Sequence, residues 1–255
     1  MLIPDCPNVS LVAFYGKKPS EFIKLILNLQ SYLHTSELIA GGFTSYELEQ
    51  VHGTIIGCEG LQTEAGIVSK WFYERRNETR YIDLANFIKY FDNCPNFPIS
   101  IRFGGYDRHI NYNFLSRGLH PYERSFQLQS LSNGKIIPVL IGWSFRANCI
   151  SMEIDNLRCN FQQFNLLHQY YKTPDSIDND FYLRLGTIES ELTAEAIKVI
   201  ENDIRHILKN KLVVDLDLDI HDLAFAQYQD LSLTPKTTKI LPVTAATLDQ
   251  VRKLY

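Results

Sequence analysis

Two strand-like segments of the chain carry the residues best suited to chemistry. One segment holds His52 and Thr54 and the other holds Tyr182 and Arg184, in each case two positions apart. Alternate side chains of a strand share a face, so the two members of each pair point the same way. A histidine suits proton transfer near neutral pH, and a threonine hydroxyl can donate a hydrogen bond to a phosphate oxygen. The first pair therefore indicates acid–base chemistry at a phosphate, although a lone strand histidine is more often structural.

The second pair offers a different chemistry at the same spacing. The guanidinium of Arg184 can bind a phosphate through two hydrogen bonds. The phenol of Tyr182 has an ordinary pKa near ~10, so it can donate a proton but is a poor base at neutral pH. With His52 as base, Tyr182 is a candidate acid. The structural alternative is that Tyr182 packs in the core and Arg184 pairs with an acidic neighbour.

The elements that must position these pairs recur in the same order. Leu11 lies 41 positions before His52 and Val139 lies 43 positions before Tyr182, although the two halves share negligible sequence identity. The apolar spacing predicts helices over residues 20–33, 81–91, 155–171 and 194–209. It predicts strands over residues 10–15, 51–57, 97–105, 126–129, 135–142, 181–188, 213–220 and 223–228, with a hairpin turn at Asn133-Gly134.

Composition narrows the class of protein and of partner. The 255 residues are 45% hydrophobic and 21% charged, which fits one large globular domain or two intimate lobes. A net charge of −4 gives no overall attraction for nucleic acid or anionic membranes and leaves only a local basic groove. No apolar run reaches the ~20 residues of a membrane span, and residues 1–7 lack a basic region followed by an apolar core. We expect a cytoplasmic protein with no membrane partner.

The cysteines and the acidic run give no sign of a metal. The five cysteines are scattered and none forms a Cys-x-x-Cys pair, so neither a zinc site nor a disulfide framework is indicated. Residues 215–219 alternate acidic and apolar side chains, which is more typical of a solvated strand face than of a metal site. We expect no metal and no cofactor.

The order of elements, together with His52-Gly53-Thr54-Ile55-Ile56-Gly57, resembles the two-histidine phosphoesterase superfamily, also called the 2′,5′ RNA ligase-like family. The resemblance covers most of residues 10–230. It includes the strand at 97–105, the strand at 138–142 and the closing segment 223–233.

This resemblance implies an α+β fold with two pseudo-symmetric strand–helix–strand lobes, whose antiparallel sheets face a central cleft. Residues 1–240 would then form a single bilobal domain, with lobe one at about 8–125 and lobe two at about 126–235. Strands are allowed to cross between the lobes. Residues 241–255 would form a C-terminal tail with a short helix.

The resemblance also implies a metal-independent reaction at a 2′,3′-cyclic phosphate or a related phosphodiester of RNA or a nucleotide. In the family each lobe supplies one histidine, one acting as general base and the other as general acid, while hydroxyls hold the phosphate. Carried over to this chain, His52 is the expected base and Thr54 the expected phosphate ligand. The expected partner is RNA or a small nucleotide.

At the second motif the chain departs from the family pattern. One alignment places Tyr182 at the histidine and Arg184 at the hydroxyl position, so that Arg184 becomes a phosphate ligand. A second alignment places Leu185 at the histidine and Thr187 at the hydroxyl. Neither restores a histidine, and His168, the histidine nearest before this motif, lies in a predicted helix.

Two further residues are candidates for substrate binding: Arg102, near the end of a strand, and Tyr106, at the start of the aromatic and basic loop 106–122. Three functions therefore remain open. The protein is a divergent phosphodiesterase with His52 as base, an inactive nucleotide- or RNA-binding module, or a protein-interaction scaffold that uses loop 106–122.

Overall fold

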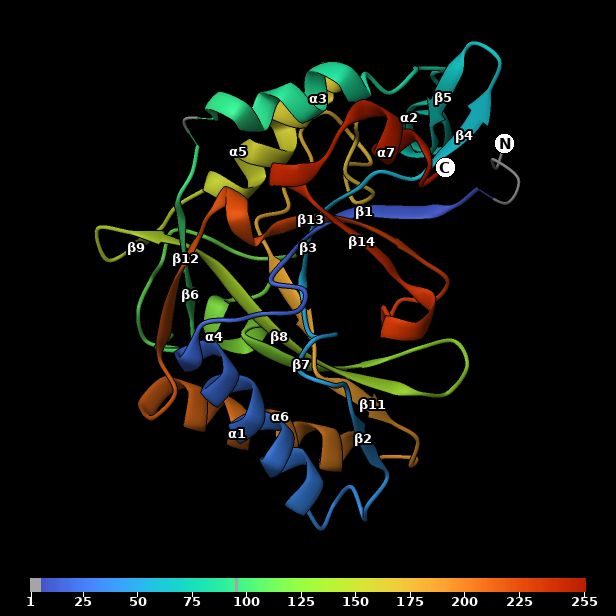
Figure 1. The fold of residues 1–255 in the computed structure, drawn as a ribbon. Coiled ribbons are helices and arrows are strands. Elements are labelled where there is room, and N and C mark those ends of the chain that lie inside the picture. Colours follow the sequence, from blue (N-terminus) through green and yellow to red (C-terminus); the bar gives the residue numbers. More distant parts are fainter. Residues whose placement is uncertain (1–5, 95) are drawn as a thin grey trace.

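The computed structural model describes residues 6–94 and 96–255 and has an α+β fold built on a twisted antiparallel sheet (Figure 1). Residues 1–5 lie outside the described residues. They form most of the N-terminal stretch on which the expectation of a cytoplasmic protein rests. Within the described ranges, no helix combines the length and the apolar character needed to cross a membrane.

Eight strands form the main path of the sheet, and the two central ones are β3 and β10. The order is β12-β6-β8-β10-β3-β1-β13-β14, with every pair antiparallel. In that order the bounds are Val214–Leu218, Ile99–Phe103, Ile136–Arg146, Phe181–Arg184, Gly53–Gly57, Asn8–Ala13, Leu223–Tyr228 and Lys239–Pro242. Strand β6 pairs with β12, and strand β13 pairs with β1, so each has a partner far away in the sequence.

Shorter strands extend this path. Strand β11 (Gly186–Ile188) pairs with β2 (Phe43–Ser45) and β8, while β7 (Phe126–Ser130) and β9 (Cys149–Ile150) also pair with β8. Strands β4 (Gly60–Thr63) and β5 (Gly66–Ser69) form a separate hairpin.

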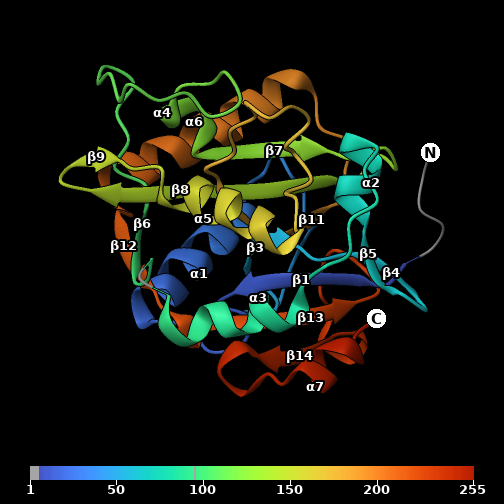
Figure 2. The ribbon, with the colours of Figure 1, turned by 90° about the horizontal axis from the view of Figure 1, so that it is seen from above.

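The helices gather at two ends of the molecule, as Figure 1 shows. Helices α1 (Ser20–Thr35) and α6 (Ala194–Asn210) lie at one end and are joined by a 2.8 Å hydrogen bond from Tyr32 to Asp203. At the other end lie α2 (Lys70–Arg76), α3 (Leu84–Tyr90), α5 (Glu153–Asn160) and α7 (Leu248–Arg252). The single-turn α4 (Pro121–Arg124) precedes β7, as the view in Figure 2 also shows.

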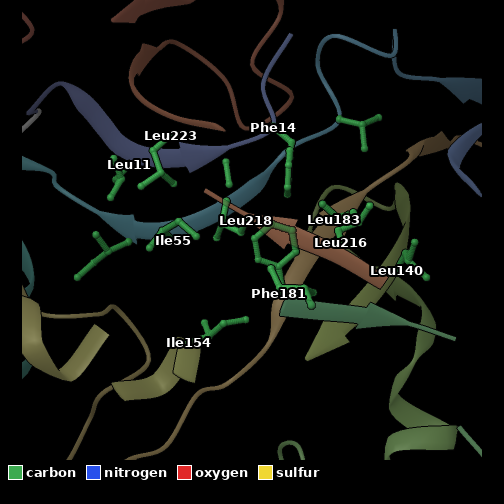
Figure 3. Packing of buried hydrophobic residues seen from close by; sticks show 14 of the residues in the cluster. Leu11, Phe14, Ile55, Leu140, Ile154, Phe181, Leu183, Leu216, Leu218 and Leu223 are labelled. Carbon is green, nitrogen blue, oxygen red and sulfur yellow. The ribbon is translucent and has the colours of Figure 1, made fainter. Parts of the chain in front are cut away.

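The main core follows from the alternation of the central strands. Leu11, Ile55 and Leu183, from three neighbouring strands, are fully buried in one cluster with Phe181 (Figure 3). Alternate side chains leave the sheet on opposite faces, so Ser10 and Val12 of β1 point away from this cluster. Val12 instead packs in a smaller cluster with Ala224, Ala226, Tyr228 and Leu233. The pocket described below opens beside this second face.

The structure corrects two of the predicted elements. The helix expected over 155–171 is shorter, because α5 ends at Asn160 and a 3₁₀ turn (Phe161–Phe164) stops at Asn165, whose φ of 60° is left-handed. Residues 166–180 are therefore irregular. The strand expected over 181–188 is divided at Leu185 into β10 and β11.

Candidate functional site

The four residues of the two motifs line one pocket. His52, Thr54, Tyr182 and Arg184 all border a cavity of about 120 Å³. That volume holds several water molecules, since one water needs about 10–15 Å³ measured in this way. The cavity therefore has room for a group the size of a phosphate, and the remainder of a larger ligand would lie at its mouth.

The pairing of β3 with β10 brings the two motifs together. Leu183 pairs with Gly53 in an antiparallel register, which puts His52 across from Arg184 and Thr54 across from Tyr182. Leu183 is buried in the core on the opposite face. The pocket residues therefore come from alternate positions of two adjacent strands.

The alternative alignment of the second motif leads elsewhere. Leu185 is fully buried in the main core. Thr187 lies in β11 opposite Thr44 of β2, and it is not among the residues that line the pocket. The alignment that reaches the pocket is the one on Tyr182 and Arg184.

A β-bulge in β3 shapes one wall of the pocket. Along β1, Ser10 pairs with Gly57 and Val12 pairs with Thr54, so β3 contains one more residue than β1 over this stretch. The extra residue changes which side chains share a face. As a result Thr54 and Gly57 both border the pocket, although they lie three positions apart.

His52 is held as a neutral base. Its Nδ1 lies 2.5 Å from the carbonyl oxygen of Gln50, and a carbonyl can only accept, so Nδ1 carries the proton and Nε2 keeps its lone pair. Burial lowers the pKa of His52 to about 4; the Gln50 contact opposes this shift, and the charges of Arg184 and Lys18 add to it. At neutral pH the imidazole is therefore uncharged.

Arg184 brings a positive charge to the pocket and forms no ion pair with any described carboxylate, although Glu59, Asp178 and Asp180 also line the cavity. In the described part of the chain no ion pair involves its guanidinium, which lies 5.9 Å from the centre of the Tyr182 ring. The side chain is only half-buried. A half-buried cation without an acidic partner favours an anionic ligand.

Tyr182 is less free to act. Its hydroxyl donates a 2.9 Å hydrogen bond to Oε1 of Gln129, and burial raises the pKa of the phenol above its usual value. The proton therefore has a protein acceptor and is harder to release than in water.

Arg158 of α5 joins the two central strands beneath the pocket. Its guanidinium donates to the carbonyl oxygens of Ile55 (2.7 Å) and Thr54 (3.1 Å) on the β3 side. On the β10 side it donates to the carbonyl oxygens of Asp178 (2.7 Å) and Asp180 (3.0 Å). The side chain is buried and fixes the spacing of the two motifs.

His168 lines the same pocket, which the sequence did not indicate because this residue was expected inside a helix. Its Nε2 lies 3.4 Å from the carboxylate of Asp178, which Arg117 also contacts at 3.0 Å. Burial and the charge of Arg158 lower the pKa of His168 to about 4, against the opposing effect of Asp178. Its Nδ1 is buried and has no hydrogen-bond partner among the described residues.

The two other candidates lie away from the pocket. Arg102 lies on β6, which is separated from β10 by β8. It forms two 2.7 Å hydrogen bonds with Asp215 and stacks on Phe145. Tyr106 is buried against Trp143 and donates to the carbonyl oxygen of Arg102. Neither residue borders the cavity. Among the described residues, no three His, Cys, Asp or Glu side chains are grouped so that they could hold a metal.

No family model matches the chain, and no curated protein matches it. Among solved structures, the chain is similar to a conserved protein of unknown function, ATU0111, from Agrobacterium tumefaciens strain C58. The sequences are 13% identical, with 92% of this chain and 85% of the other covered and a TM-score of 0.45. This distant likeness carries no argument about function.

Proposed function

We propose that the pocket binds the phosphate of a phosphodiester, namely a 2′,3′-cyclic phosphate at the end of RNA or on a nucleotide. Arg184 and Thr54 hold the phosphate oxygens, and His52 is the base. The observation that carries the proposal is the position of Arg184, which forms no ion pair with any described carboxylate, across from the neutral His52 in one small cavity.

The proposed fold relation rests on the strand order. On either side of the β3–β10 junction stand four strands, β3-β1-β13-β14 on one side and β10-β8-β6-β12 on the other. We assign these halves, apart from the end of β14 at residues 241 and 242, to two related lobes within residues 1–240 that face the pocket. Strands β6 and β13 fit such a pair of lobes, because β13 pairs with β1 of one half and β6 pairs with β8 of the other.

Hydrolysis would use the groups already in place. Nε2 of His52 takes a proton from water as the water oxygen attacks phosphorus, and one P–O ester bond breaks. The leaving ribose oxygen takes the proton of Tyr182, and the imidazolium of His52 returns a proton to the phenolate through solvent. The products are a phosphate monoester and a free hydroxyl, with no net change in the protein.

Binding without cleavage is the second candidate, and the state of Tyr182 favours it. The hydroxyl already donates to Gln129 and its pKa is raised, which opposes proton transfer to the leaving oxygen. Both candidates require the same phosphate contacts, so they separate only on turnover.

Calorimetry and a product assay with 2′,3′-cyclic AMP in EDTA test both candidates. Arg184→Ala should weaken binding about 10- to 150-fold, since a hydrogen bond to a charged group contributes about 1.5–3 kcal/mol. Arg146→Ala, which removes an arginine whose side chain is 72% exposed, is the matched control and should bind like wild type. If Arg184→Ala binds equally well, the phosphate proposal is wrong.

The catalytic candidate adds a second measurement. His52→Ala should reduce turnover about 10²- to 10⁴-fold, the usual contribution of a general base, while binding changes much less. If wild type binds 2′,3′-cyclic AMP and releases no product, the protein is a binding module and not a phosphodiesterase for this ligand. Turnover that survives His52→Ala would exclude His52 as the base.

A further inference from the structure

Two exposed apolar side chains stand among the residues that line the pocket. Tyr170 is 45% exposed and Leu231 is 57% exposed. They come from separate segments, Tyr170 from the irregular stretch before β10 and Leu231 from the turn that follows β13. Ligand sites typically combine apolar and aromatic side chains with a few polar groups, and these two side chains supply the apolar part here.

The ring of Tyr170 is held by two neighbours and still leaves 45% of the residue exposed. The guanidinium carbon of Arg117 lies 4.0 Å from the ring centre, and the ring of His168 meets it edge-on at 5.4 Å. Arg117 is itself held by Asp178 at 3.0 Å and by Asp180 at 3.7 Å, and both carboxylates are buried. A ring held in this way loses little conformational entropy when a ligand stacks on it.

The tyrosines of loop 106–122 are less exposed than Tyr170. Tyr106 is 2% exposed and Tyr122 is 6% exposed, and Tyr112 is half-buried. Tyr106 packs edge-on against Trp143. Of the aromatic rings that border the pocket, Tyr170 has the most exposed surface, because Tyr182 and Tyr228 are half-buried and buried respectively.

We propose that Tyr170 is the stacking platform for a nucleobase whose attached phosphate is held by Arg184, with Leu231 completing the apolar mouth. This inference rests on the proposed function and specifies the ligand as a base-bearing phosphoester. Aromatic side chains stack on any base, because every base has a π-face. The site therefore prefers nucleotides to sugar phosphates and discriminates weakly among bases.

Calorimetry with three stable phosphate monoesters tests the inference. The probes are adenosine 3′-phosphate, uridine 3′-phosphate and ribose 3-phosphate, which a phosphodiesterase does not cleave. Wild type should bind both nucleotides about 5- to 150-fold more tightly than ribose 3-phosphate, because stacking on one base contributes about 1–3 kcal/mol. Tyr170→Ala should remove that preference and leave ribose 3-phosphate binding unchanged, whereas Tyr170→Phe should keep the preference.

Tyr81→Ala is the matched control, since Tyr81 is 43% exposed and does not border the pocket. If wild type binds ribose 3-phosphate as tightly as the nucleotides, and Arg184→Ala weakens all three, the stacking inference is overturned while the phosphate site stands. If Tyr170→Ala weakens all three probes equally, the inference is also overturned. If wild type binds none of them, the inference fails; the proposed function fails with it only if 2′,3′-cyclic AMP is not bound either.

Discussion

Across the junction of β3 and β10, a neutral imidazole faces a guanidinium, and each affects the chemistry of the other. The charge of Arg184 contributes to the lowered pKa of His52, so it helps to keep Nε2 unprotonated. An anion bound at Arg184 would offset that charge and raise the pKa of His52 toward its ordinary value. Under the proposed function, the base would therefore gain proton affinity only when the phosphate is in place.

Gly53 is the residue on which this close approach depends. A Cβ at this position would lie 2.2 Å from Cζ of Phe181, whose ring is fully buried against Phe14 and Phe103. Gly53→Ala should therefore lower the free energy of unfolding by about 1–3 kcal/mol, the usual effect of overpacking, as measured by urea denaturation. Adding Phe181→Leu should recover part of the loss. An unchanged unfolding free energy for Gly53→Ala would contradict this packing.

The sequence predicted which side chains share the pocket where this depends only on the alternation of side chains along a strand. His52, Thr54, Tyr182 and Arg184 reach the pocket because residues two apart on a strand share a face. Tyr170 could not be placed in this way, because its position depends on where α5 ends.

Helix α5 matters to the site through one side chain. Arg158 is buried and donates to four backbone carbonyl oxygens that belong to the β3 and β10 segments, and it also contacts the carboxylate of Asp178 at 3.3 Å. Removing the guanidinium leaves these acceptors and a buried carboxylate without their donor. Breaking a buried ion pair in this way typically costs about 3–5 kcal/mol.

Arg158→Lys should therefore destabilise the protein by several kcal/mol in urea denaturation, since an ammonium has three donors and lacks the planar fork of arginine. Arg146→Lys, at an exposed ion pair with Glu153, is the control and should change stability by less than about 1 kcal/mol. Equal stability of the two variants would show that Arg158 does not join the central strands.

The end of α5 and the long-range strand pairs could not be predicted from local sequence patterns. The apolar positions after Asn160 continue the helical spacing, so they predicted a helix to residue 171. The left-handed Asn165 ends it, and buried contacts between His168, Asp178 and Arg158 hold the following segment against the strands. Likewise, the pairing of β6 with β8 and β12 joins segments far apart in the sequence, which local periodicity cannot indicate.

The free energy of unfolding of the whole molecule depends on pH through two buried, neutral histidines, His52 and His168. In the folded protein burial lowers the pKa of His52 and that of His168 to about 4, against about 6.5 in an unfolded chain. The charges of Arg184 and Lys18 also lower the pKa of His52. For His168, the charges of Arg158 and Arg117 lower the pKa and that of Asp178 raises it. The pKa of the Asp178 carboxyl is held below its usual range, so its own contribution is lost only at lower pH, below the unfolded carboxyl pKa of about 3.9.

Stability should consequently fall as pH decreases from about 6.5 to about 4. In this window the unfolded chain takes up a proton at each histidine and the folded protein does not, so each histidine lowers the unfolding free energy by up to about 1.4 kcal/mol per pH unit. Urea denaturation at pH 7.5, 6 and 5 measures this fall. The double variant His52→Gln and His168→Gln should flatten the dependence, whereas His206→Gln, at an exposed position on α6, should leave it as in wild type. If the double variant shows the same pH dependence as wild type, the two imidazoles are not held neutral by burial, and the base assigned to the pocket loses its physical support.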